Sequence, residues 1–125
     1  MSQITKVGRV LVPVADQDEA IAFYTKVLGF SVVADIAFGE GSRWVEVAAP
    51  QGGACIALVP PQGRFEVGRM TGIGLESGDA RAEHTRLKEQ GVDVDEQLFG
   101  GDGTVPLLFF FRDNSGNQLM VAQPQ

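Results

Sequence analysis

The chain contains two copies of one pattern, and this internal repeat restricts the possible folds more than any other feature. Asp16 and Asp79, each at the start of a predicted helix, are 63 residues apart. Gly53 and Gly116, each before the last predicted strand of its half, have the same separation. A unit that cannot bury both faces of its own sheet needs a partner, so the two copies are expected to form a pseudo-symmetric pair around one core.

Each half is predicted to contain one strand, one helix and three further strands. Val10, Val12 and Val14 alternate with other residues as is typical of a strand with one buried face. The predicted strands are residues 6–14, 31–38, 42–49, 54–60, 72–77, 92–99, 104–112 and 117–123, and the predicted helices are 16–29 and 79–91. The pattern therefore predicts an α+β fold in which each half is one βαβββ module.

The length of 125 residues is suited to one domain, residues 1–125, with modules at approximately 4–60 and 70–123. The 16 acidic residues outnumber the 10 basic ones, and no Lys/Arg cluster occurs, so nucleic acid and anionic membranes are poor partners. The single cysteine, Cys55, excludes an intramolecular disulfide. No signal-like segment or membrane-length apolar run is present, so a cytoplasmic location is expected. The only histidine, His84, is expected on the solvated face of the second helix.

Two stretches carry a family resemblance. The segment VGRVLVPVADQDEAIAFYTKVLGF resembles the opening of the vicinal oxygen chelate superfamily, and RDNSGNQLMV is similar to its closing turn and strand. That superfamily contains glyoxalase I, bleomycin resistance proteins, extradiol dioxygenases and fosfomycin-modifying enzymes. The resemblance implies that the two modules form a curled mixed sheet around a central cavity, and that the chain forms a homodimer.

Catalytic members of this superfamily hold a divalent metal with ligands from the first and last strands of each module. The corresponding residues here are Arg9, Ala57, Gly72 and Met120, and the repeat supports this assignment because both pairs are 63 residues apart. Arginine has no lone pair to offer, glycine and alanine have no donor, and a thioether suits hard divalent ions poorly. We therefore predict no metal and no other cofactor.

Strand alternation predicts which side chains face the cavity. The predicted ligand-binding residues are Arg9, Leu11, Trp44, Glu46, Cys55, Ala57, Gly72, Glu76, Phe109 and Met120, and Gly74, Leu107, Phe111 and Gln118 are assigned to the same face. Arg9 is expected to pair with Glu46 or Glu76, either as a structural ion pair or as part of a ligand-recognition site. Gly72 and Gly74 are expected to permit close approach of a ligand or of Met120.

These observations leave three functions open. The favoured one is a metal-free small-molecule-binding protein that sequesters an antibiotic or an aromatic metabolite. The alternative is a lyase, isomerase or dioxygenase of the same superfamily, with an unorthodox metal site or with Glu46 or Glu76 as a general base. The third is a subunit or partner-binding module whose cavity is vestigial.

Overall fold

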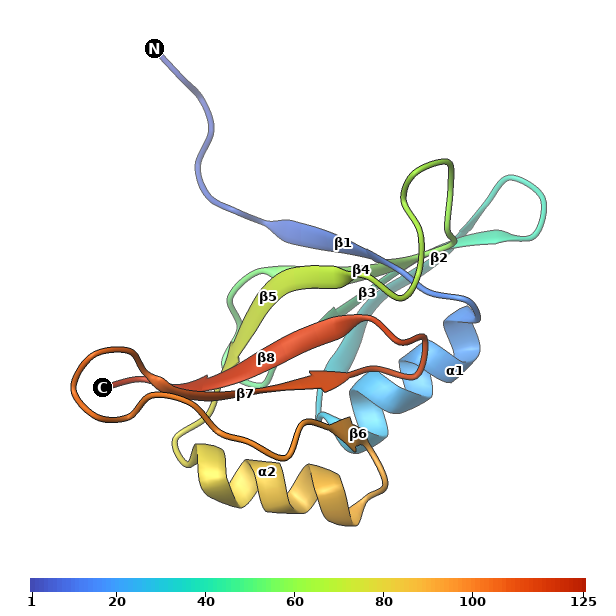
Figure 1. Ribbon diagram of the computed structural model, residues 1–125. Coiled ribbons are helices and arrows are strands. Elements are labelled where there is room, and N and C mark those ends of the chain that lie inside the picture. The colour runs from blue at the N-terminus through green and yellow to red at the C-terminus, as the bar shows by residue number, and fades with distance from the viewer. The chain divides into compact units, whose positions relative to one another are not determined.

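The computed structural model describes residues 1–125, which divide into two compact units, Met1–Val67 and Gly68–Gln125 (Figure 1). Each unit holds one mixed four-stranded sheet that does not close, together with one helical segment. The α+β fold class and the βαβββ order of each half are thereby confirmed. None of the helices is long and apolar enough to cross a membrane.

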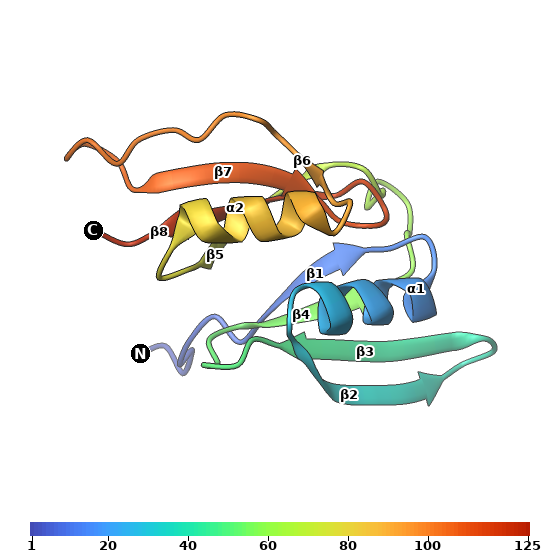
Figure 2. The same ribbon diagram turned by 90° about the horizontal axis from the view of Figure 1, so that it is seen from below.

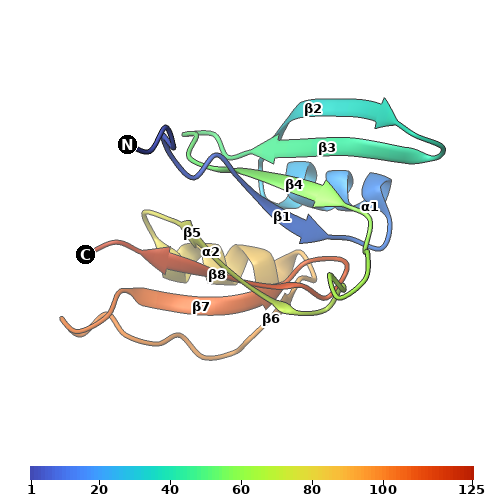
Figure 3. The same ribbon diagram turned by 90° about the horizontal axis from the view of Figure 1, so that it is seen from above.

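The first unit has its strands in the spatial order β1-β4-β3-β2, with the helix on one side of the sheet (Figure 3). Strands β1 and β4 are parallel, and the other two pairs are antiparallel. The elements are β1 (Arg9–Pro13), α1 (Gln17–Ala22), the π-helical turn η1 (Phe23–Val27), β2 (Ser31–Phe38), β3 (Ser42–Ala48) and β4 (Cys55–Val59).

The second unit repeats this topology with the order β5-β8-β7-β6, and α2 lies against its sheet (Figure 2). Its elements are β5 (Met70–Glu76), α2 (Ala80–Glu89), β6 (Asp93–Val94), β7 (Leu107–Arg112) and β8 (Gln118–Gln123). The strand predicted at 92–99 is shortened to two residues, and Phe99 forms only an isolated bridge with Leu108.

Both helices begin where the sequence predicts. The Asp16 side chain accepts a hydrogen bond from the Glu19 backbone N–H at 2.9 Å, and Asp79 accepts one from Ala82 at 3.0 Å. Each aspartate satisfies a backbone donor that has no partner inside its helix. The first helical segment is followed by Gly29, whose φ of 80° is the left-handed conformation that glycine adopts without strain.

The core of each unit lies between its sheet and its helix. In the first unit the completely buried side chains include Val12, Val45, Val47, Leu58 and Tyr24. In the second unit they include Leu87, Phe109, Phe111 and Leu119. Burial of an apolar side chain of this size contributes about 1.5–3 kcal/mol, so these rows provide much of the driving force for folding.

The turn between β7 and β8 is held by two buried polar side chains. Asp113 Oδ1 accepts hydrogen bonds from the Ser115 and Asn117 backbone N–H groups at 2.9 and 3.0 Å. Asn117 Oδ1 in turn accepts a bond at 2.9 Å from the backbone N–H of Gly68, just before β5. These bonds join the closing turn to the first residues of the same unit.

The expectation that His84 lies on a solvated face is wrong. The residue is 9% exposed, its Nε2 lies 2.7 Å from the Asp95 carbonyl oxygen, and its ring meets Phe109 edge-on at 5.0 Å. The irregular segment after β6 stays beside β7, where the Asp95 N–H donates to the Phe110 carbonyl oxygen at 3.0 Å, and it supplies this acceptor, which helical spacing alone does not reveal.

Candidate functional site

The face of the first sheet that points away from α1 gathers six of the predicted residues. Leu11 is paired with Ala57, Ala57 with Glu46, and Glu46 with Ala34, so one row of side chains crosses all four strands. Directly paired residues project to the same side of a sheet. Arg9, paired with Cys55, and Trp44, paired with Ile36, lie on the same face at neighbouring positions.

A carboxylate is the polar centre of this face. Glu46 Oε2 accepts a hydrogen bond from Trp44 Nε1 at 2.5 Å and one from Arg9 Nε at 3.2 Å. The Glu46 side chain is 12% exposed, whereas that of Arg9 is 53% exposed. A buried carboxylate without partners would be costly, and these two donors compensate it. The predicted ion pair of Arg9 is thus confirmed, with Glu46 as the partner.

Apolar side chains surround this polar group. Leu11 is 43% exposed, Ile36 60% and Phe38 52%, and exposed apolar side chains that share one face are typical of an interaction site. Ile36 and Phe38 were not among the predicted site residues. The alternation of Ala34, Ile36 and Phe38 was visible in the sequence, but their face depends on the pairing of Ile36 with Trp44.

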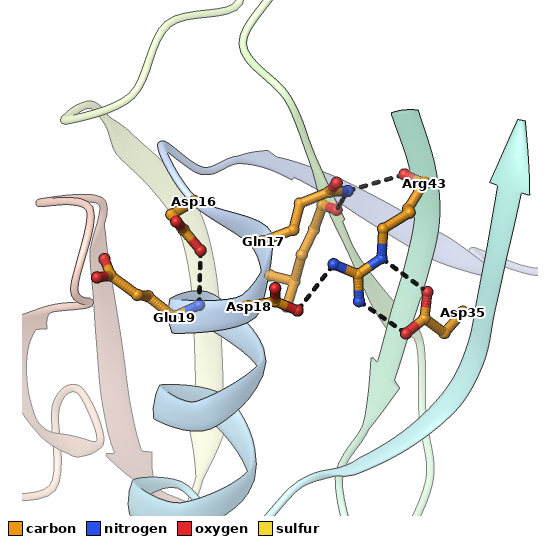
Figure 4. A network of polar contacts seen from close by, with 7 residues as sticks. Asp16, Gln17, Asp18, Glu19, Asp35 and Arg43 are labelled. Carbon is orange, nitrogen blue, oxygen red and sulfur yellow. Dashed lines mark hydrogen bonds and ion pairs between the residues drawn. The ribbon is translucent and has the colours of Figure 1, made fainter. Parts of the chain in front are cut away.

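On the opposite face of the same sheet, Arg43 links the strands to the helix through hydrogen bonds (Figure 4). Its guanidinium donates to Asp35 at 3.0 and 2.8 Å and to Asp18 at 2.8 Å. The hydrogen bonds with Asp35 and Asp18 raise the pKa of Arg43, and the bond with Arg43 lowers the pKa of Asp35. Gln17 Nε2 adds bonds to the carbonyl oxygens of Arg43 and Leu58 at 2.8 and 2.9 Å. These contacts hold α1, β2, β3 and β4 together beneath the site.

The remaining predicted residues belong to the second unit. Met120 lies beside Gly74, where an added Cβ would be 2.9 Å from the methionine Cε. The predicted close approach of Met120 to a glycine is therefore present at Gly74. Gly72 has a φ of 76° and lies where the β5 register shifts, and Glu76 is exposed opposite Ala122.

The expected face of Phe109 is wrong, and so are those of Leu107 and Phe111. Phe109 is paired with Val121 and contacts His84, so its side chain lies in the helix-facing core. The reason is a change in the repeat offset. Ala57 of β4 corresponds to Met120 of β8, and these two residues are 63 apart. In β3, Ala57 pairs with Glu46, and in β7, Met120 pairs with Phe110, but Glu46 and Phe110 are 64 apart. A shift of one residue along a strand moves every side chain to the other face.

The residues at the family's metal positions do not fit a divalent metal. Arg9 offers only donors and already binds Glu46, Ala57 and Gly72 have no side-chain donor, and Met120 offers a thioether. No group of three or more His, Cys, Asp or Glu side chains is placed to hold a metal ion among residues 1–125. The absence of a metal stays a prediction.

The fold, the repeat and the closing turn together define a class of protein. The family model described as the Glyoxalase/Bleomycin resistance protein/Dioxygenase superfamily matches residues 6–121, and the chain belongs to this superfamily.

Three relatives illustrate the similarity. The uncharacterized protein YurT of Bacillus subtilis (strain 168) is 32% identical in an alignment 121 positions long that covers 88% of this chain and 92% of YurT. TnmS3, an antibiotic binding protein from Streptomyces sp. CB03234, is 31% identical, with 100% of both chains covered and a TM-score of 0.84. A superfamily member from Sphaerobacter thermophilus DSM 20745 is 28% identical, with 98% of this chain and 100% of that chain covered and a TM-score of 0.89.

Proposed function

We propose that this protein binds an aromatic small molecule without a metal, and that it sequesters an antibiotic or an aromatic metabolite in this way. The observation that carries the proposal is the buried Glu46 carboxylate, held by Trp44 and Arg9 on a sheet face where Leu11 and Ile36 leave apolar surface exposed. A few fixed polar groups within an apolar surface are typical of small-molecule sites. The similarity to an antibiotic binding protein over the whole chain supports the same function.

The exposed apolar side chains supply the driving force for binding. An aromatic ligand that covers about 200 Å² of apolar surface on Leu11, Trp44 and Ile36 would gain roughly 5 kcal/mol before the cost of association. The hydrogen bond from Trp44 Nε1 to Glu46 fixes one edge of the indole ring, so little side-chain freedom remains to be lost on binding.

The acid–base alternative has less support. One Glu46 oxygen already accepts two hydrogen bonds. Glu76 is exposed, and the β5 residues on its side of the strand, Gly72 and Gly74, are exposed as well. A general base must lie within hydrogen-bond reach of the proton that it removes. Binding without chemistry therefore explains the arrangement more simply.

Trp44 provides a direct test because it is the only tryptophan. Its indole N–H gives a single cross-peak in a ¹H–¹⁵N spectrum of the labelled protein. Aromatic antibiotics and metabolites that raise the melting temperature are expected to shift this cross-peak to saturation. Ile36→Glu should abolish the shift, whereas Val105→Glu, at a residue 48% exposed in the other unit, should not. Ligands that bind but leave the Trp44 cross-peak unmoved would contradict the proposal.

Metal content tests the proposal that the protein binds its ligand without a metal. Protein purified without added metal is expected to contain far less than one equivalent of transition metal by elemental analysis. About one equivalent of tightly held metal per chain would instead favour the enzymatic alternative.

We further propose that the chain acts as a cytoplasmic homodimer. Strand β2 is an edge strand of its sheet, and its residues Val32 and Val33 are 41% and 55% exposed. Long apolar edge strands are usually covered in native proteins, and a second copy would cover this one. Sedimentation equilibrium at micromolar concentration should give twice the chain mass of 13.4 kDa, and a monomer would contradict the dimer.

A further inference from the structure

We propose that the site on the first sheet selects aromatic ligands that carry an anionic acceptor group, such as a carboxylate, and that Arg9 recognises this group. The inference rests on the proposed function and adds the chemical class of the ligand. It follows from the way in which the three polar side chains of this face share their hydrogen bonds.

The first step concerns the free donors of Arg9. Its Nε binds Glu46, and the two Nη groups form no hydrogen bond within the chain. The side chain is 53% exposed, so these groups are available to a ligand. A guanidinium is planar and presents paired N–H groups that match the two oxygens of a carboxylate.

The second step concerns charge. Glu46 neutralises Arg9 formally, but its carboxylate is buried whereas the guanidinium is open, so the exposed part of the pair is the cation. The other charged residues of these four strands, Asp35 and Arg43, are paired with each other and face α1. Arg9 is thus the one exposed cation of this sheet face, although the whole chain has a formal charge of -6.

The third step concerns orientation. Glu46 holds Arg9 Nε with the same oxygen that accepts the Trp44 N–H, so the guanidinium and the indole are positioned relative to each other. Arg9 is 37 residues before Glu46 in sequence, and the pair is formed only by the sheet. A flat ligand that packs on Trp44 and Leu11 can direct a substituent toward Arg9. The contact with Glu46 reduces the freedom that Arg9 would lose on binding.

The test compares three probes with the same ring system: 2-naphthoate, 2-naphthylmethanol and 2-naphthylmethylammonium. Their affinities are measured at pH 7 and low salt by titration calorimetry and by the Trp44 indole cross-peak. A charge-assisted bond to Arg9 should make 2-naphthoate bind about tenfold tighter than the alcohol, and tighter still than the ammonium probe.

Variants connect this preference to Arg9. Arg9→Gln should bind the carboxylate and the alcohol equally, and the double variant Arg9→Gln/Glu46→Gln should do the same without an unpaired buried carboxylate. Arg81→Gln makes the same charge change at an exposed position of α2 and should keep the preference. Retention of the preference in both Arg9 variants would overturn the inference.

The outcomes separate the two proposals. Equal binding of all three probes, or tightest binding of the ammonium probe, would overturn the inference and leave the proposed function standing. If none of the probes shifts the Trp44 cross-peak at millimolar concentration, both the inference and aromatic binding at this face are overturned.

Discussion

The two units of this chain share their topology but differ on the sheet face that points away from the helix. In the first unit this face carries Arg9, Glu46 and Trp44 in one hydrogen-bonded group. In the second unit the positions that correspond to Arg9 and Glu46 are Gly72 and Phe110, and the polar group of this face is instead Arg112, which donates to Asp93, Asp95 and Gln118. The repeat therefore extends to the core, and the outer face has diverged.

The difference shows which positions the fold constrains. Residues that face the helix must be apolar in both units because they form the core, as Val12, Leu58 and Val121 do. Residues on the other face have no such role within their unit, so they are free to acquire polar or small side chains. A binding function is expected to develop on this face.

The largest expected effect tests which face of β7 is buried, and therefore whether β3 and β7 correspond with an offset of 64 residues. Phe109→Ala should lower the free energy of unfolding by about 3–5 kcal/mol because Phe109 is completely buried against His84. Phe110→Ala, on the outer face, should cost about 1.5–2.5 kcal/mol by the same rule, since its side chain is only half-buried. Urea denaturation of both variants measures the difference, and a greater loss from Phe110→Ala would show that the face assignment is reversed.

A second prediction compares the turns before the last strands. Asn117 corresponds to Ala54 of the first unit, and Asp113 to Pro50, so the buried hydrogen bonds of this turn exist only in the second unit. Asn117→Ala should cost about 1–3 kcal/mol because the Gly68 N–H loses its acceptor. Asn114→Ala changes an exposed residue of the same turn and should cost less than about 0.5 kcal/mol. Equal costs in thermal unfolding would contradict this difference between the turns.

A third prediction concerns the two glycines of β5. Gly72 has a φ of 76°, so Gly72→Ala should cost about 1–2 kcal/mol of backbone strain. Gly74→Ala instead places a Cβ 2.9 Å from the flexible end of Met120, which can move aside, so a smaller loss is expected. The Met120 methyl resonance should shift in Gly74→Ala. An unchanged resonance would mean that Met120 does not lie over Gly74.

The smallest expected effect concerns an arginine–aspartate pair, which occurs in both units. Hydrogen bonds from Arg43 and Arg112 lower the pKa of Asp35 and of Asp93, respectively. A lowered pKa in the folded state gives stability that is present above the unfolded-state pKa and is lost as the pH falls through the folded-state pKa. Both carboxylates are exposed, so solvent screening keeps the contribution small.

Titration of the aspartate side chains by NMR measures these pKa values. Both should lie below the ordinary value for aspartate, and Arg43→Gln should raise the pKa of Asp35 without changing that of Asp93. An ordinary pKa for Asp35 in the unsubstituted protein would show that the Arg43 contact does not persist in solution.

Much of the fold was predictable because its signals are local. The caps at Asp16 and Asp79 and the alternation in β1 depend on neighbours in sequence, and the structure confirms them. The ion pair of Arg9 was also predicted, but its partner remained open between Glu46 and Glu76. The choice depends on strand pairing between distant parts of the chain, which a single sequence does not encode as a pattern.

The sequence by itself determined the element order, the repeat, the superfamily and the unsuitable side chains at the metal positions, because each depends on residue type and spacing. Tertiary structure decided that Phe109 faces the core, that His84 is buried and that Ile36 and Phe38 border Trp44 and Glu46. The physical reason is register. Side chains alternate along a strand, so one residue of slippage between paired strands reverses a face, and only the hydrogen-bonded sheet specifies that register.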